Sequence, residues 1–146
     1  MKIELRGQSF DPWQELARHE SDLRIQHAGD YGAAAVFVGS VRDFNVGEMV
    51  HALVLEHYPG MTERHLETIT REAVTRWELI DALVLHRYGK LAPNDPIVLV
   101  AAWSAHRAEA FAACRYLIEE LKSRVPFWKQ ETLPTGPRWV THNTPG

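Results

Sequence analysis

Hydrophobic and polar positions follow two different periods along the chain, and the period changes several times between strand-like and helix-like spacing. Residues 1–6 alternate in period two, as expected of a strand. Residues 62–77 instead place apolar side chains at helical spacing, and so does the segment from 105 to about 124. The expected elements are strands over 1–6, 32–41, 50–58, 82–88, 97–103, 127–133 and 138–141, and helices over 12–19, 62–77 and 105–124.

Capping and breaking residues define several ends of these elements. Asp11 and Pro12 are typical of an N-cap and a first helical position, and the short helix that they open should reach about His19. Ser104 is expected to cap the long helix that begins at residue 105, and Pro126 is expected to end it.

Two further segments carry specific expectations. Segment 32–41 (GAAAVFVGSV) is small and β-rich, which is typical of a strand buried on both faces. Segment 42–48 is polar and rich in turn formers, which predicts a mobile loop. The resulting order, βαββαββαββ, predicts a single domain over residues 1–146 that is an α+β or α/β sandwich with mixed strand directions.

The composition is that of an ordinary folded domain, with 146 residues of which 45% are hydrophobic and 24% charged. The net charge of -3 disfavours a general nucleic-acid binder, so any anion site must be a local cluster of cations. No apolar run approaches the ~20 residues of a membrane span, and none at the start resembles a signal peptide. A single cysteine allows no internal disulfide, which suits a cytoplasmic protein.

The sequence carries none of the common catalytic signatures: no glycine-rich phosphate loop, HExxH, Cys-x-x-Cys or Gly-x-Ser-x-Gly. We therefore expect no metal site and no bound cofactor. Cys114 shares an apolar helical stripe with Phe111, Leu117, Ile118 and Leu121, so core packing is favoured over a role as sulfur carrier. If sulfur chemistry occurs here, the sulfur must arrive on another molecule.

Three cationic positions are candidates for anion binding. His106 and Arg107 lie in the first turn of the long helix, where N–H groups attract anions, although a solvated Arg and a partly packed His are an equal alternative. Arg42 opens the loop after a strand, which is a common binding position but weak evidence by itself.

His51 and His57 lie ~20 Å apart along one expected strand, so they cannot hold one metal ion.

Two lysines, Lys122 and Lys129, flank the break at Pro126. A lysine near a helix C-terminus is favourable without any function, and Lys129 would share a strand face with Glu131 as a surface ion pair. The sharper interpretation is a lysine whose pKa is lowered by cationic neighbours, able to act as general acid or base or to attack a carbonyl.

Six sequence blocks contain these cations and occur in a fixed order. They are Phe37-Val-Gly-Ser-Val-Arg42, Leu55-Glu-His-Tyr-Pro-Gly-Met-Thr-Glu63, His86-Arg-Tyr-Gly-Lys-Leu91, Ser104-Ala-His-Arg-Ala-Glu-Ala-Phe111, Leu121-Lys122 and Pro126-Phe-Trp-Lys-Gln-Glu131. Together they resemble the MoaE family of molybdopterin synthase large subunits. The resemblance runs from about Gly32 to Val140.

The resemblance implies a fold, an activity and an assembly. The fold would be an α/β-hammerhead with an additional antiparallel β subdomain. The enzyme would be a sulfurtransferase of molybdenum cofactor biosynthesis that acts on cyclic pyranopterin monophosphate. The sulfur would come from the C-terminal thiocarboxylate of a small ubiquitin-like subunit of the MoaD family, in two rounds that build the molybdopterin dithiolene. The assembly would be a heterotetramer around a central homodimer of this chain.

The resemblance also implies roles for individual residues. Lys122 would position the donor tail and handle protons at its carbonyl, while Lys129 and Arg42 would stabilise negative charge. His106 and Arg107 would hold the phosphate. The catalytic residues would be Lys122, Lys129 and Arg42, and the substrate-binding residues would be Ser40, Val41, Arg42, His106, Arg107, Lys122, Lys129, Gln130 and Glu131.

The expected helix keeps two parts of this set apart. His106 and Lys122 are sixteen residues apart, which is ~24 Å at 1.5 Å per residue. We therefore expect a composite site, with Lys122 from one subunit and His106 and Arg107 from another. The sequence departs from the family pattern at Ser40 and Gln130, which are uncharged, and at Asn94, which replaces a frequent glycine but tolerates positive φ.

Two other classes of function remain open at this level. A non-catalytic module that docks a ubiquitin-like tail would need an apolar surface but not Lys122, Lys129 and Arg42 together. A small phosphate-ester hydrolase would need a metal site or a nucleophile, and the sequence offers neither.

Overall fold

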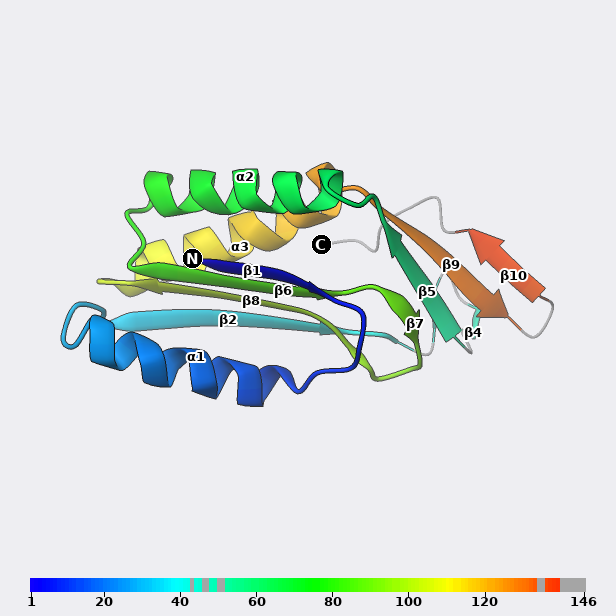
Figure 1. Cartoon of the computed structure of the whole chain (residues 1–146), viewed down its shortest axis with the longest axis horizontal. Coiled ribbons are helices and arrows are strands. Elements are labelled where there is room, and N and C mark those ends of the chain that lie inside the picture. Colours follow the sequence, from blue (N-terminus) through cyan, green and yellow to red (C-terminus); the bar gives the residue numbers. More distant parts are fainter. Residues whose placement is uncertain (43, 46–47, 50–51, 134–135, 140–146) are drawn as a thin grey trace.

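The computed structural model describes residues 1–42, 44–45, 48–49, 52–133 and 136–139. Within these ranges no helix is both long and apolar enough to cross a lipid bilayer. The chain forms a four-stranded main sheet, three helices that cover it, and a smaller sheet at one end (Figure 1).

The main sheet has the strand order β1-β6-β8-β2, in which β1 and β6 are parallel and the other neighbours are antiparallel. Helix α1 covers one face, and α2 and α3 lie side by side on the other (Figure 1). The strands are β1 (Lys2–Arg6), β2 (Ala33–Ser40), β6 (Asp81–Arg87) and β8 (Pro96–Ser104), and the helices are α1 (Pro12–Gln26), α2 (Met61–Arg76) and α3 (Arg107–Arg124).

The small sheet is entirely antiparallel and has the order β10-β9-β5-β7. It is the additional β subdomain expected from the sequence, and it lies beyond the C-terminal end of α3 (Figure 1). A two-residue hairpin accompanies it. The strands are β5 (Ala52–His57), β7 (Gly89–Leu91), β9 (Phe127–Leu133) and β10 (Gly136–Trp139), and the hairpin consists of β3 (Phe44–Asn45) and β4 (Glu48–Met49).

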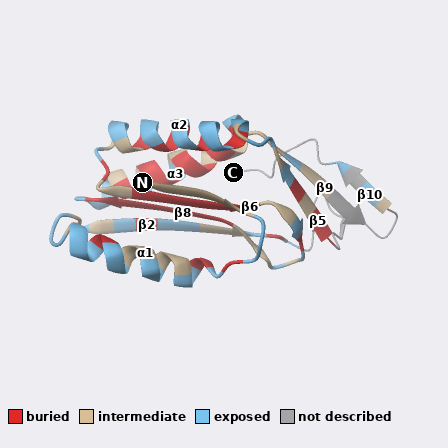
Figure 2. Ribbon diagram, viewed as in Figure 1, coloured by how far each residue is buried: buried red, intermediate tan, exposed pale blue. Residues whose placement is uncertain are grey.

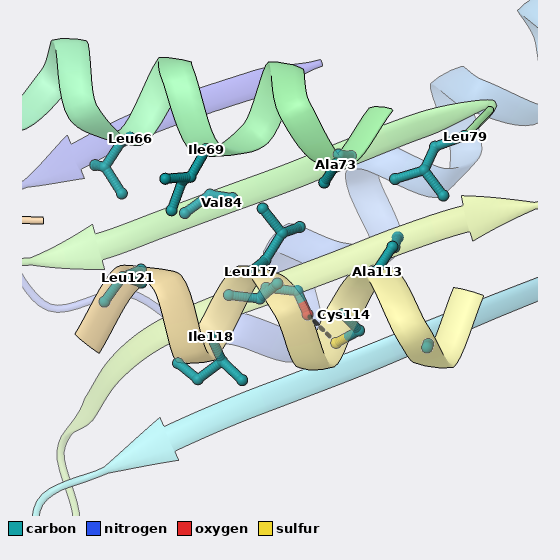
Figure 3. Close-up of a cluster of buried hydrophobic side chains, with 14 of the residues drawn as sticks. Leu66, Ile69, Ala73, Leu79, Val84, Ala113, Cys114, Leu117, Ile118 and Leu121 are labelled. Carbon is teal, nitrogen blue, oxygen red and sulfur yellow. Dashed lines mark hydrogen bonds between the residues drawn. The ribbon is translucent and has the colours of Figure 1, made fainter. Parts of the chain in front are cut away.

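The largest core cluster fills the space between α2, α3 and the main sheet (Figure 2). Leu66 and Ile69 of α2 and Leu117 of α3 are at most 1% exposed, and Figure 3 shows them converging on Val84 of β6. Cys114 belongs to this cluster, as the sequence predicted. Because this packing holds α3 along its length, it also fixes both ends of the helix.

Two predicted features of the N-terminal half are wrong. Helix α1 continues to Gln26, because Leu23 is buried against the other face of the main sheet and no breaker occurs before Gly29. Strand β2 is an edge strand with Ala34 and Val36 exposed, not a strand buried on both faces. Small apolar residues occur in edge strands as well as in central strands of a sheet, so the sequence could not distinguish these two positions.

The start of α3 also differs from the expectation. Ser104 is the buried last residue of β8, and His106 occupies the N-cap position. The Ser104 Oγ accepts only a long hydrogen bond, 3.4 Å, from the His106 N–H. Phe111 was expected in the apolar stripe but is 68% exposed, because α3 turns that position away from the sheet.

The segment 42–48 was expected to be a mobile loop, but its described part is paired. Phe44 and Asn45 pair with Met49 and Glu48 as the hairpin β3–β4, while residues 43, 46 and 47 lie outside the described part. The three-residue strand β7 was not predicted, since its residues carry little apolar pattern. Asn94 has a φ of 71°, so the turn keeps the left-handed conformation that asparagine tolerates.

Candidate active site

The register of the small sheet determines which way Lys129 points. Lys129 pairs directly with Leu55, and directly opposed residues of an antiparallel pair share one face. Leu55 is 1% exposed and packs with Val41 and Leu91 in a cluster on the inner side of the small sheet. Lys129 therefore leaves β9 on the inner face and is half-buried there.

Lys122 approaches the same region from α3. It lies in the last turn of the helix, four residues after Ile118, so it adjoins the buried face and is itself half-buried. The chain then turns at Pro126 into β9, and Thr62 at the start of α2 donates a 2.8 Å hydrogen bond to the Pro126 carbonyl. This contact ties the end of α3 and the start of β9 to α2.

A histidine that the sequence did not single out is affected by the charges of both lysines. His86, on β6, is 4% exposed, and its ring stacks on Phe127 with centroids 4.0 Å apart and planes at 18°. Burial, followed by the positive charges of Lys129 and Lys122, lowers the pKa of His86 to about 4, although a hydrogen bond to the Arg87 carbonyl opposes the shift. Both lysines therefore disfavour a positive charge on this ring.

The segment from Ser40 to Arg42 is held against the turn that precedes β8. The Val41 N–H donates to the Asp95 carbonyl at 3.0 Å, and the Val41 carbonyl accepts from the Asn94 N–H at 2.7 Å. The Val41 side chain is buried, whereas Ser40 and Arg42 are exposed on either side of it. Val41 thus anchors the strand end, and Ser40 and Arg42 are the two side chains that a ligand could reach.

His106 and Arg107 lie at the opposite end of α3 from Lys122, and both are exposed (Figure 1). The helix is continuous from residue 107 to residue 124, so the ~24 Å separation expected from the sequence holds within one chain. Lys122 and Lys129 both act on His86 through their charges, whereas His106 and Arg107 lie at the far end of the helix from Lys122.

The remaining predicted residues lie on β9. Gln130 pairs with Val54 and Trp139, and the alternation of side chains along a strand places it on the face opposite Lys129. That outer face carries a row of exposed aromatic rings, including Trp128 and Trp139 with centroids 5.8 Å apart. Glu131 pairs with Leu53 in the backbone register, and its side chain lies outside the described part.

The single cysteine is inert in this environment. Cys114 is 7% exposed, and its thiol donates a 3.8 Å hydrogen bond to the Val100 carbonyl (Figure 3). Burial raises the pKa of the Cys114 thiol to about 11, so a thiolate does not form at neutral pH. Among the described residues, no three His, Cys, Asp or Glu side chains gather as metal ligands would.

Sequence reasoning missed His86 because the residues that act on it are distant from it along the chain. A histidine that ends the apolar run Ala82 to Leu85 reads as an ordinary core residue. The two lysines that act on it come from α3 and β9, far along the chain. Only the packing of β6 against both elements reveals the group.

Comparison with known proteins gives a consistent result. The family model described as MoaE protein matches residues 11–124. The molybdopterin synthase catalytic subunit of Pseudomonas aeruginosa is 50% identical over 140 residues, which cover 96% of this chain and 90% of the relative. The Escherichia coli K12 protein of the same name is 48% identical over 129 residues, which cover 88% and 79%.

Solved structures show the same fold. The molybdopterin biosynthesis MoaE protein from Burkholderia ambifaria superposes with a TM-score of 0.78 at 46% identity, covering 95% of this chain and 88% of that one. Molybdopterin synthase from Staphylococcus aureus gives a TM-score of 0.81 at 32% identity, covering 95% and 96%. A chain from the complex of subunits 1 and 2 of molybdopterin-converting factor of Helicobacter pylori shares the fold at 18% identity, with a TM-score of 0.80 and coverage of 97% and 92%.

The family match covers most of the chain, and the two curated relatives are covered over 90% and 79% of their own length. The chain therefore belongs to the MoaE family, whose curated relatives are molybdopterin synthase catalytic subunits.

Proposed function

We propose that this chain is the catalytic subunit of a molybdopterin synthase and transfers sulfur from the C-terminal thiocarboxylate of a small ubiquitin-like subunit to cyclic pyranopterin monophosphate. Two such transfers would build the dithiolene of molybdopterin. The observation that carries the proposal is a pair of half-buried lysines, Lys122 at the end of α3 and Lys129 on β9, whose positive charges both act on the buried ring of His86. Two cations in a partly buried site suit a substrate and a donor that are both anionic.

The chemistry needs no nucleophile from this chain. The thiocarboxylate sulfur is itself nucleophilic, and the only cysteine of the chain is buried with a raised pKa. Lys122, in the last turn of α3, would position the donor tail and handle protons at its carbonyl. Lys129 and Arg42 would stabilise the negative charge that develops on the substrate and the intermediate. Ser40 and Glu131 would contribute to substrate binding, as the family resemblance implies.

The proposed partner is a MoaD-type subunit, and the proposed compartment is the cytoplasm, where such a thiocarboxylate would be made and consumed. The Helicobacter pylori chain of the same fold was solved in a complex of two different subunits, which supports a hetero-oligomeric arrangement. A heterotetramer would then place one small subunit at each end of a central homodimer.

The edge strand β2 offers a surface for that homodimer. None of the described strands pairs with its outer edge, and Val36 and Phe37 are 38% and 36% exposed. Long apolar edges are usually covered in native assemblies. If β2 paired antiparallel with β2 of a second copy about a twofold axis, the Ala33 end of one strand would lie beside the Ser40 end of the other.

This arrangement would complete the site. The Ala33 end of β2 pairs with Ser104, next to His106 and Arg107, and the Ser40 end leads to Arg42. An eight-residue strand is about 27 Å long, close to the ~24 Å from residue 106 to residue 122 along α3. Antiparallel pairing would therefore bring the phosphate-binding pair of one copy to the lysine end of the other.

Reconstitution tests the activity. Purified protein is mixed with a thiocarboxylated small subunit and the cyclic pterin, and molybdopterin is measured for wild type, Lys122→Ala and Lys90→Ala. Lys90 is an exposed lysine of β7 and serves as the matched control. We expect product from wild type and Lys90→Ala and a loss of at least about a hundredfold in Lys122→Ala. Tight partner binding without product in wild type would instead favour a scaffold that only docks the small subunit.

Mixing two inactive variants tests the composite site. Lys122→Ala and Arg107→Ala are combined and allowed to exchange subunits. If each site takes one residue from each copy, half of the dimers are mixed and each of these has one intact site. About one quarter of wild-type activity should then return. No recovery above the separate variants would place both residues in the same chain's site.

A further inference from the structure

One carboxylate on α2 binds two residues of α3 that are eight positions apart in the sequence. The Tyr116 hydroxyl donates a 2.6 Å hydrogen bond to Glu72 Oε2. The Arg124 guanidinium donates to both carboxylate oxygens of Glu72, at 2.9 and 3.2 Å. Eight residues of helix span about 12 Å, so a single side chain of α2 holds the C-terminal part of α3 along two turns.

Helical spacing explains how α3 presents these groups to α2. Tyr116, Glu120 and Arg124 recur every four residues, so they form one row on the helix surface. Arg124 also donates a 2.9 Å hydrogen bond to Glu120, which places its guanidinium between two carboxylates. The hydrogen bonds from Arg124 and Tyr116 lower the pKa of the Glu72 carboxyl, so Glu72 is ionised at neutral pH. Together Glu72, Tyr116, Glu120 and Arg124 form the Glu72 network.

The ring of Tyr116 has further contacts at the C-terminal end of α2. It meets the ring of Trp77 edge-on, with centroids 5.2 Å apart. The Arg76 guanidinium lies 4.5 Å from the centroid of Trp77 and 5.8 Å from that of Tyr116. These contacts restrain the tyrosine, so its hydroxyl meets Glu72 from a defined position.

Lys122 lies within the stretch of α3 that the Glu72 network holds. The ends of helices tend to fray because their last carbonyl groups lack partners within the helix, and Lys122 is in the last turn. Leu121 and Val125 are buried and restrain the core side of this turn. The Glu72 network restrains the side that faces α2, so the turn resists both unwinding and rotation about the helix axis. The direction in which Lys122 leaves the helix depends on both restraints.

The arrangement of the network matters more than its charge alone. Glu72 and Arg124 are 42% and 43% exposed, and an isolated ion pair of that exposure adds little to global stability. A bidentate arginine within a network of several groups is the case in which an exposed pair maintains a geometry. Glu72 and Arg124 are also 52 positions apart, so their contact restrains one helix against another. The exposed pair Arg115–Glu119, in contrast, joins neighbouring turns of α3 only.

We propose that Glu72 is a positioning residue for Lys122: by binding Tyr116 and Arg124 it holds the last turns of α3 against α2 and fixes the direction in which Lys122 leaves the helix. The significance for sulfur transfer rests on the proposed function, in which Lys122 positions the donor tail. The restraint on α3 is a property of this chain alone and can be measured without substrate or partner.

Amide hydrogen exchange tests the restraint directly. Glu72→Ala removes the carboxylate from a surface position of α2 without lowering helix propensity. Glu119→Ala is the matched control, because Glu119 is 45% exposed and loses a 2.9 Å ion pair with Arg115. In Glu72→Ala we expect the amides of residues 121–124 to exchange about fivefold faster than in wild type, while residues 107–113 stay within about twofold. In Glu119→Ala both segments should stay within about twofold of wild type.

Two outcomes of the exchange measurement would overturn the proposal. The first is unchanged exchange at residues 121–124 in Glu72→Ala. The second is a rise of equal size along the whole of α3, or an equal rise in Glu119→Ala, since either would indicate a general effect of losing a surface charge.

NMR of the unsubstituted protein provides a test that does not depend on the folding of a variant. A guanidinium bound between two carboxylates rotates slowly about its Cζ–Nε bond, so the Nη hydrogens of Arg124 should give separate signals. Arg115 has a single carboxylate partner in the described structure and should give averaged signals. Averaged signals for Arg124 as well would overturn the proposal.

The reconstituted reaction connects the restraint to activity. We expect kcat to fall about fivefold in Glu72→Ala and to stay within about twofold of wild type in Glu119→Ala, with KM for the small subunit unchanged in both. Tyr116→Phe keeps the ring and removes one hydrogen bond to Glu72, so its kcat should be intermediate. If wild type makes no product while the exchange result holds, the proposed function fails and the restraint of α3 by Glu72 stands. If wild type is active and Glu72→Ala retains full kcat, the positioning role is overturned.

Discussion

Asp81 gives a quantitative prediction about acid stability. One carboxylate oxygen lies 2.9 Å from the Met1 ammonium and the other lies 2.7 Å from His19 Nε2, so this single side chain ties the N-terminus and α1 to the start of β6. Burial by itself would raise the pKa of Asp81. The hydrogen bonds from His19 and the Met1 ammonium outweigh that effect and lower the pKa to about 2, from 3.8.

The lowered pKa of Asp81 determines how stability changes with pH. Because the pKa of Asp81 is lower in the folded state than in the unfolded state, its stabilisation is fully present above about pH 4 and is lost as pH falls toward 2. A fall from 3.8 to about 2 corresponds to about 2 kcal/mol of unfolding free energy. The side chain is 13% exposed, so solvent screening reduces this figure only modestly.

The test uses Asp81→Asn, with Asp30→Asn as a matched control at an exposed aspartate. Urea unfolding at pH 6 should show a loss of about 2 kcal/mol in Asp81→Asn and almost none in Asp30→Asn. At pH 3 the difference between wild type and Asp81→Asn should narrow to about 1 kcal/mol, because the carboxylate is then largely protonated in the unfolded state while it is still mostly ionised in the folded state. If the difference in unfolding free energy between wild type and Asp81→Asn is the same at pH 6 and pH 3, the linkage argument is refuted.

Three further predictions concern the core around α3. Leu117→Ala, at a fully buried position, should lower the unfolding free energy by about 2–5 kcal/mol in urea titrations; a change below about 1 kcal/mol would contradict the packing described. Cys114 should resist iodoacetamide at pH 8 until the protein is unfolded, and Cys114→Ala should keep full activity in the reconstituted assay; rapid labelling of the native protein would count against burial of the thiol. Thr62→Val should cost about 1–3 kcal/mol by calorimetry, because the Pro126 carbonyl loses its donor and the Tyr58 N–H loses its acceptor; Thr62→Ser, which keeps both bonds, should cost clearly less.

Periodicity predicted the helices and most strands because their apolar spacing is strong and their ends carry clear signals. Helix α2 was expected over 62–77 and spans Met61–Arg76, and β9 was expected over 127–133 and spans Phe127–Leu133. The length of α1 was underestimated, since Leu23 is one buried residue in a largely charged segment. The edge position of β2 was missed because it depends on sheet order, which periodicity does not encode.

The candidate site was predictable only in part. Lys122, Lys129 and Arg42 were found through their resemblance to a family and through their positions at element ends. Their arrangement could not be read from the chain, because it depends on how α3, β6 and β9 pack. For the same reason the sequence did not indicate that the charges of both lysines act on His86.

The fixed length of α3 has a consequence for how this chain can vary. One residue inserted in the helix would displace everything after it by 1.5 Å and rotate it by about 100° relative to everything before it. Lys122 would then leave the side of the helix that adjoins the small sheet, while His106 and Arg107 would stay where they are. Surface loops of this fold can tolerate insertions, but the number of residues between His106 and Lys122 cannot change. A one-residue insertion between them should abolish activity even in a protein that still folds.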